Sequence, residues 1–258
     1  MARKCVFCGS SLQGQKSNEH IFPRWLQKHL GSEYQQLYHT LYTIEGKPDN
    51  CRDFPFYSHV SGLVCKQCNT GWMNEEMEKP AKPLLVPLVD GTYDGDISPE
   101  DCHIIALWLF KTALTLHSAS QQERYVPTEH YATLYKRRAI PRGVVITIAY
   151  HKDRDKNDLS WIQSGNWGLP RWIIQSEQLN AYLKKAYRIT MRAGHLAWRI
   201  HYWPKENRPP VGLSEYDPSS VRYIHPIRGK GVSWPPARPI SGIREFDASL
   251  MIFSPPPA

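Results

Sequence analysis

The chain has 258 residues, of which 41% are hydrophobic, and it carries a formal net charge of +8. This composition excludes a disordered class, and at roughly 150 residues per domain the length suggests one large domain or two small ones. The positive charge favours a polyanionic partner, although solubility alone would also account for it.

Membrane and secretion signals are not found in the sequence. No run of apolar residues approaches the ~18 that a membrane span needs. Arg3, Lys4 and Cys5 stand where the apolar core of a signal peptide would begin. We therefore expect a cytoplasmic protein with no membrane partner. In that reducing compartment, cysteines are expected to be thiols or metal ligands rather than disulfides.

The first predicted feature is a metal site that two cysteine pairs form together. Four cysteines form two C-x2-C pairs, which are Cys5 and Cys8 in "KCVFCGS" and Cys65 and Cys68 in "VCKQCNTGW". Together they predict one tetrahedral Zn²⁺ site, which is structural because four thiolates leave no open position. The alternatives are thiols that never meet, or a redox-active pair. Cys51 and Cys102 have no partner pair, and we interpret them as ordinary small residues.

The segment "SNEHIFPRWLQ" lies between the two pairs and places Glu19 next to His20. A histidine with a pKa near neutrality can take the proton from a water that attacks a phosphodiester. A carboxylate can hold a hard divalent ion against the leaving oxygen. Asn69 directly follows Cys68, so the zinc site would hold it beside this strand as a further ligand. The alternative is a buried histidine bonded to backbone, with Glu19 as a solvated acid.

Three further elements are expected before residue 81. "PRWLQKHLG" (23–31) predicts a short helix that ends at its glycine. The stretch 38–59 predicts a hairpin around the turn-rich "EGKPDN". After Asn69, "TGWMNEEMEKP" predicts a helix that ends at Pro80.

The arrangement C-x2-C, then acid-His-Ile-x-Pro, then C-x2-C-Asn resembles the zinc-knuckle branch of the HNH endonucleases. The resemblance covers residues 5–80. It implies a ββα-metal module whose first strand carries the catalytic histidine and whose helix carries the last motif residue. By this resemblance His20 is the general base, and Glu19 and Asn69 are ligands of a catalytic Mg²⁺ or similar ion. The four paired cysteines then match the structural zinc ligands.

Two positions depart from that family pattern. The middle asparagine of the motif has no clear counterpart, and His59 is the nearest polar residue. The residue one helical turn after Asn69 is Met73, which is no ligand for a hard ion. Asn74, Glu76 or water would have to complete the coordination sphere.

Residues 81–97 are rich in Pro, Gly and Asp and are predicted to be a linker, which makes 1–80 and 98–258 the two domains. In the second domain, Ser98 is predicted to cap a buried core helix. The remaining elements are expected to be a helix in 128–138, a central strand in 143–151 and a hairpin over 186–203 that turns at Ala193-Gly194.

The hairpin belongs to a basic segment with interleaved aromatic residues. Arg188, Arg192 and Arg199 could form a face that contacts phosphates, with aromatic rings that stack on unpaired bases. The alternative is a sheet with a charged outer face and an aromatic inner face, because simple alternation predicts the same pattern.

Together these features predict an α+β protein with an N-terminal ββα-metal HNH module, a structural zinc site and a C-terminal mixed α/β domain. The expected activity is metal-dependent hydrolysis of DNA phosphodiester bonds, with RNA as another possible substrate. The resemblance also implies a bacterial or phage role in defence or mobile elements. Two alternatives remain: an inactive zinc-containing nucleic-acid-binding module, and a complex-assembly module that docks a protein partner through its C-terminal domain.

Overall fold

The computed structural model describes most of the chain. The described residues are 3–42, 48–120, 125–153, 159–164, 186–202, 212–213, 217–227, 229–248 and 253–254. Trp203 and the residues after 254 are not among the described residues, so the predictions that concern them are not tested.

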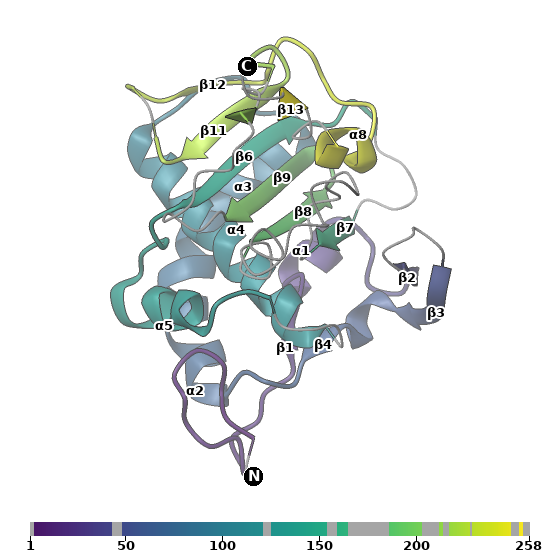
Figure 1. The fold of residues 1–258 in the computed structure, drawn as a ribbon, viewed down its shortest axis with the longest axis vertical. Helices are drawn as coiled ribbons and strands as arrows, with labels where there is room; N and C mark the ends of the chain where they lie inside the picture. The colour runs from purple at the N-terminus through teal and green to yellow at the C-terminus, as the bar shows by residue number, and fades with distance from the viewer. Residues whose placement is uncertain are drawn as a thin grey trace.

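A two-stranded ribbon organises the N-terminal part. Strand β1 (Glu19–His20) pairs antiparallel with β4 (Val60–Ser61), so that His20 is opposite Val60. The segment between the two strands carries α1 (Arg24–His29), the hairpin of β2 (Gln36–Tyr42) and β3 (Pro48–Pro55), and the short helix η1 (Phe56–Ser58). The predicted helix and hairpin are therefore confirmed, and the hairpin projects to one side of the molecule (Figure 1).

A helical segment with a kink at Gly71 follows the second cysteine pair. It runs through α2 (Lys66–Cys68), a π-helix η2 (Asn69–Glu78) and α3 (Lys79–Asp90). The prediction that this helix ends at Pro80 is wrong, because Glu78 and Lys79 keep helical backbone angles and Pro80 lies in the first turn of α3.

The predicted linker 81–97 is not an irregular segment, since it contains most of α3 and the strand β5 (Gly95–Ile97). Pro83 and Pro87 lie inside α3. The helix buries one apolar face, which is formed by Ala81, Leu85, Leu88 and Val89. These positions follow the i, i+4, i+7, i+8 spacing of an amphipathic helix, and their burial offsets the hydrogen bonds that the prolines remove.

The C-terminal part is an antiparallel sheet packed on a long helix. Helix α4 (Pro99–Ala119) begins at the predicted cap, where the Ser98 hydroxyl accepts a hydrogen bond from the Asp101 amide, and it is followed by α5 (Thr128–Arg137). Five described strands form the sheet in the order β11–β6–β9–β8–β7. Their bounds are β6 Val144–Tyr150, β7 Leu159–Ser164, β8 Tyr187–Ala193, β9 Leu196–Tyr202 and β11 Val221–His225.

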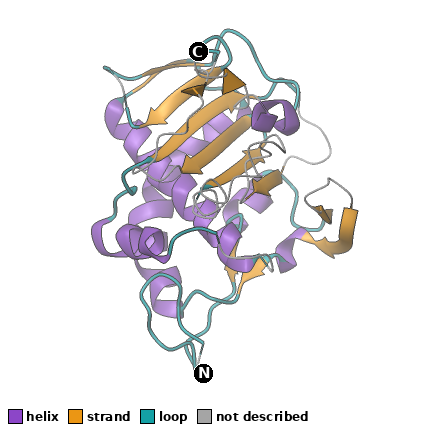
Figure 2. Cartoon of the chain, in the orientation of Figure 1, coloured by secondary structure: helices purple, strands orange, loops and turns teal. Residues whose placement is uncertain are grey.

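The sheet lies in front of α3 and α4, and α8 (Ile243–Ala248) lies over its other side (Figure 2). Trp198 of β9 faces α4, where its ring centroid is 6.0 Å from that of Trp108. The predicted central strand, the buried helix and the hairpin turn at Gly194 are confirmed. All pairs in this sheet are antiparallel, so the fold is α+β and the prediction of a mixed α/β domain is wrong for the described residues.

The arginines of the hairpin do not form an exposed basic face. Arg188, Arg192 and Arg199 are at most 6% exposed. Arg188 makes an ion pair with Asp247 of α8 at 2.7 Å, and Arg199 donates to the carbonyl of Phe246. The alternation predicted from the sequence is present, but α8 covers Arg188 and Arg199, and Arg192 donates to the carbonyls of Gly194 and Asp153. The prediction that these three side chains contact phosphates is therefore wrong.

The remaining described strands are short. They are β10 (Gly212–Leu213), β12 (Val232–Trp234) and β13 (Phe253–Ser254). In the described part of the chain, no helix has the length and apolarity that crossing a bilayer requires.

Buried histidines make stability depend on acidity. Burial lowers the pKa of His130 to about 4, and burial together with Arg199 and Arg188 lowers that of His201 well below its usual value. Below about pH 6.5 these histidines are protonated in the unfolded chain but not in the folded chain. Their contribution to the free energy of unfolding is therefore complete above that pH and decreases as the pH falls. We expect a loss of about 2 kcal/mol from His130 at about pH 5, and a loss in the same direction from His201.

Urea unfolding at several pH values checks this expectation, with zinc content followed in the same samples. His130→Gln keeps a hydrogen-bonding group next to Tyr187, whose hydroxyl lies 2.9 Å from the imidazole, and should remove one histidine's share of the pH dependence. A pH dependence that is unchanged in this variant would contradict the assignment.

Candidate active site and metal centre

The two cysteine pairs meet at the N-terminal end of the molecule. The Sγ atoms of Cys5 and Cys68 are 3.9 Å apart, and those of Cys8 and Cys65 are 3.6 Å apart. All four lie within 4.8 Å of one another. Gly9 follows the first pair with φ of 77°, a left-handed conformation that suits glycine and lets the chain turn tightly.

This geometry fits a tetrahedral metal ion. With Zn–S bonds of about 2.3 Å, the sulfurs of a tetrahedral site are about 3.8 Å apart, which matches the two separations above. The amides of Cys65 and Cys68 donate to the Sγ atoms of Cys5 and Cys65, both at 3.4 Å. Such outer hydrogen bonds hold thiolate ligands in place. A metal such as zinc therefore fits these four residues, and a protein-filled coordination sphere makes the site structural.

The thiols of the cluster shift one another's pKa. A hydrogen bond with the Cys68 thiol lowers the pKa of Cys5 to about 4, and the same interaction raises the pKa of Cys68. A thiolate is the form of cysteine that binds metal. Cys51 is exposed and Cys102 is buried, and both are free thiols outside the cluster.

A second site lies where β1 meets the helix η2. A cavity of about 370 Å³ is lined by Glu19 and His20 of β1 and by Asn69 of η2. These are the three residues that the sequence predicted for catalysis. The strand pairing holds the first two, and the cysteine cluster holds Cys68 immediately before Asn69. The structure thus brings the three predicted residues together in one cavity.

Two further polar residues of the cavity come from the same helix. Asn74 and Glu78 line it together with Asn69. Asn69 and Asn74 lie on either side of a kink at Gly71, whose ψ of −115° interrupts the helical path. Sequence reasoning named Asn74 as one option and missed Glu78, because a regular helix after Asn69 was assumed.

A buried cation lies behind the carboxylates. Lys111 of α4 is 0% exposed, and its Nζ is 2.7 Å from Glu78 Oε1 and 3.5 Å from Glu19 Oε1. Burial alone would lower the pKa of Lys111, but the charges of Glu78 and Glu19 outweigh it and raise that pKa. We name Glu19, Glu78 and Lys111 the charge triad. When all three groups are ionised, the two carboxylates and one ammonium give the charge triad a net charge of −1.

The two adjacent residues of β1 differ in their titration. Burial raises the pKa of Glu19 to about 7, while the charge of Lys111 opposes this shift. Burial and the charge of Arg24 lower the pKa of His20, and a hydrogen bond to the Tyr57 backbone opposes that shift. The imidazole of His20 is therefore neutral at pH 7, the state in which it can accept a proton.

Two residues that the sequence offered as substitutes lie elsewhere. His59 is not in this cavity; its ring stacks on Trp161 with centroids 4.7 Å apart. Glu76 makes an ion pair with Arg138 at 2.8 Å on the exposed side of η2. The suggestions that His59 replaces the middle asparagine, or that Glu76 completes a metal site, are therefore not supported.

The charge triad should also determine stability. We expect Lys111→Met to lower the free energy of unfolding by about 3–5 kcal/mol, because it leaves carboxylates buried without a partner cation. Urea unfolding near neutral pH measures this loss. Replacing both acids as well (Glu19→Gln and Glu78→Gln) should recover part of it.

The exposed pair Lys79–Glu75 provides the control, since both side chains are more than half exposed. Lys79→Met should leave the unfolding curve almost unchanged. Equal losses in Lys111→Met and Lys79→Met would show that the triad is not an energetic unit.

The fold and the first site define the class of this protein: an α+β chain with a four-cysteine cluster that can bind a metal such as zinc. Among the described residues, the four cysteines are the only group of three or more His, Cys, Asp or Glu side chains placed to hold an ion together. No family model matches the chain, and neither do any curated protein sequences or solved structures.

Proposed function

We propose that the chain is a metal-dependent endonuclease of the HNH type that hydrolyses phosphodiester bonds, with DNA as the first candidate substrate. One observation carries the proposal: Glu19, His20 and Asn69 line the same cavity, although the cavity joins a strand to a helix almost 50 residues further along the chain. The order of the contributing elements, strand β1, strand β4 and then a helix that starts at the cysteine cluster, also fits this class.

In this proposal His20 is the general base. Its neutral imidazole takes a proton from a water molecule, and the resulting hydroxide attacks phosphorus. Arg24 also lines the cavity and can neutralise a phosphate that enters it.

The oxygens of Glu19, Asn69, Asn74 and Glu78 would hold a divalent ion such as Mg²⁺. Carboxylate and amide oxygens are the hard donors that this ion prefers. When bound, such an ion supplies stabilisation of the charge on the leaving oxygen. Glu78 is the addition that the tertiary structure makes to the predicted ligand set.

The charge triad favours a second candidate function. Lys111 already partners both carboxylates, so the cavity is compensated without a metal ion. A zinc-containing module that binds nucleic acid or assembles a complex, and does not cut, is consistent with this compensation. A cytoplasmic location remains a prediction for either candidate.

The test is plasmid cleavage by the purified, zinc-loaded protein with Mg²⁺, with Mn²⁺ or with no added divalent ion. The nuclease predicts nicked or linear product only when a divalent ion is present, and the same product with Glu78→Gln at a lower rate. Retardation of the plasmid in a gel without any cutting would favour the binding module instead.

A further inference from the structure

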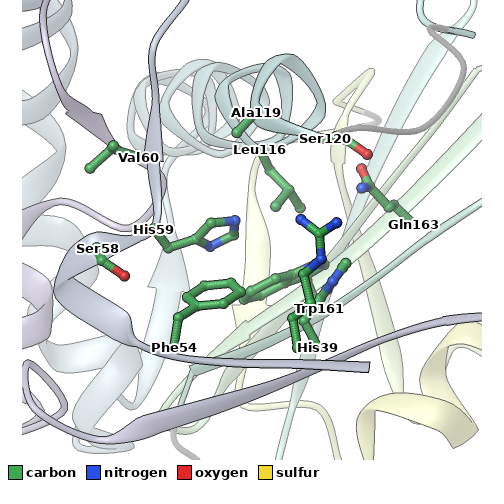
Figure 3. Close-up of a pocket in the computed structure, with 11 residues that line it drawn as sticks. His39, Phe54, Ser58, His59, Val60, Leu116, Ala119, Ser120, Trp161 and Gln163 are labelled. Carbon is green, nitrogen blue, oxygen red and sulfur yellow. The ribbon is translucent and has the colours of Figure 1, made fainter. Parts of the chain in front are cut away.

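A second cavity, of about 210 Å³, lies where the inserted hairpin meets the sheet. It is bounded by β2, β3 and η1, by the C-terminal end of α4, and by the edge strand β7. The residues that line it include His39, Arg52, Phe54, His59, Trp161 and Gln163. Figure 3 shows the rings of Phe54, His59 and Trp161 gathered on one side and the Gln163 amide across from them.

The walls of this cavity are aromatic. The His59 ring stacks on Trp161 at 4.7 Å with an interplanar angle of 22°, and the Phe54 ring centroid lies 5.3 Å from that of His59. Burial and the charge of His39 lower the pKa of His59 to about 3, so this ring is uncharged at neutral pH. His39 also stacks on Trp161, with ring centroids 6.0 Å apart, so a nucleobase would pack against the parts of these neutral rings that the cavity exposes.

Two polar atoms in the cavity wall have no hydrogen-bond partner in the described part of the chain. His59 Nδ1 and Gln163 Oε1 are buried and make no hydrogen bond among the described residues. Buried polar atoms without a partner are uncommon in folded proteins and call for an explanation. A histidine nitrogen and an amide side chain are groups that pair with the edge of an unpaired base. A ligand with donors and acceptors around a ring would satisfy both atoms.

The charge of the cavity points to an anionic ligand. Arg52 contributes an exposed guanidinium, and no Asp or Glu is among the described residues that line the cavity. Arginine recognises phosphate through its planar set of N–H donors. A purely apolar ligand would leave the two polar atoms unpaired, and a metal ion would find no carboxylate here.

The cavity also adjoins the candidate active site. The carbonyl of His59 accepts a hydrogen bond from the amide of Ile21, and Val60 pairs with His20. A ligand in this cavity is therefore one strand pair away from the proposed general base.

We propose that this cavity binds a single unpaired nucleotide, with its base against Trp161 and His59 and its phosphate at Arg52. At about 210 Å³ it has room for one ring system and excludes a base pair. Nucleotide binding by this cavity does not depend on the proposed function. Only the statement that the nucleotide belongs to the strand being cut rests on it. The cavity thus directs the enzyme to single-stranded or locally unpaired nucleic acid.

The test measures binding in a His20→Ala background without added divalent ions, so that cleavage plays no part. Fluorescence anisotropy compares a labelled single-stranded DNA with the same sequence as a duplex, and calorimetry tests 5′-dAMP and 5′-dTMP. We expect the single strand to bind more tightly than the duplex. Trp161→Leu should weaken single-strand binding by about 5- to 150-fold, the range for loss of one stacked base.

Arg52→Gln tests the same cavity through an exposed side chain, so its effect does not depend on whether Trp161→Leu folds. Arg142→Gln removes an exposed arginine that does not line the cavity and serves as the matched control. If the free mononucleotides bind, and Arg52→Gln weakens that binding, the cavity is a site for a free nucleotide. Binding of the strand alone, weakened in the same variant, would assign it to a nucleotide within a strand.

The proposal is overturned if Arg52→Gln binds like Arg142→Gln, or if the duplex binds as tightly as the single strand. Failure of plasmid cleavage with intact, variant-sensitive binding would reject only the nuclease. The two proposals can therefore fail separately.

Discussion

Replacing His20 with alanine should reduce cleavage by about 10²- to 10⁴-fold while the folded structure and its zinc remain, because removal of a general base has an effect of this size. The ring is half-buried beside the cavity and makes no ion pair in the described structure, so its loss should cost little stability. The measurement is the initial rate of plasmid nicking with Mg²⁺, with metal content and melting temperature determined on the same samples.

The pH profile gives an independent check on the same residue. Since burial and Arg24 hold the pKa of His20 below its usual value, the part of the rate that depends on His20 should rise with pH only in the acid range. A further change in rate near pH 7 would report Glu19, whose pKa burial raises to about 7. His103→Ala is the matched control, because His103 is an exposed histidine of α4 outside the cavity. Equal rates in His20→Ala and the unsubstituted protein would remove His20 from the mechanism.

Replacing Cys68 with serine should release the zinc ion and unfold the N-terminal part of the chain. The serine hydroxyl is a poor substitute for a thiolate, and structural zinc sites contribute about 10–16 kcal/mol of apparent binding free energy to folding. Loss of even about 4 kcal/mol would lower the melting temperature by roughly 8–16 °C. Elemental analysis, thermal unfolding and limited proteolysis measure the three consequences.

Cys51→Ser is the control for this experiment, because Cys51 is an exposed free thiol outside the cluster. It should keep its zinc and its melting temperature. A Cys68→Ser protein with full zinc content would place the metal elsewhere. Asn69 directly follows Cys68, so cleavage should also fall in this variant, as a consequence of the lost structure.

The features that could be predicted from the sequence are those encoded by short spacings. Two C-x2-C pairs predicted the cysteine cluster, Ser98 and Pro99 predicted the start of α4, and Gly194 predicted the hairpin turn. In each case neighbouring residues suffice, because caps, turns and knuckles are made by local backbone geometry. The grouping of Glu19, His20 and Asn69 was expected only through the cysteines that hold the two segments together.

One failure concerns the weight given to local signals, and the other concerns a contact between distant parts of the chain. Pro80 was given more weight than the apolar spacing of Ala81, Leu85 and Leu88, although that spacing was visible in the sequence. Glu78 was missed because its ion pair with Lys111, 33 residues further along the chain, cannot be read from a local residue pattern.

The sequence by itself determined which residues could carry chemistry, and the tertiary structure decided which of them are accessible. Arg188 looks like a surface charge until Asp247, 59 residues away, buries it in an ion pair. Lys111 looks like an interruption of an apolar helix until Glu78, 33 residues away, partners it. The same local sequence can place a charged side chain in water or in the interior beside an opposite charge. Only long-range packing distinguishes the two cases, because desolvation depends on what covers the side chain.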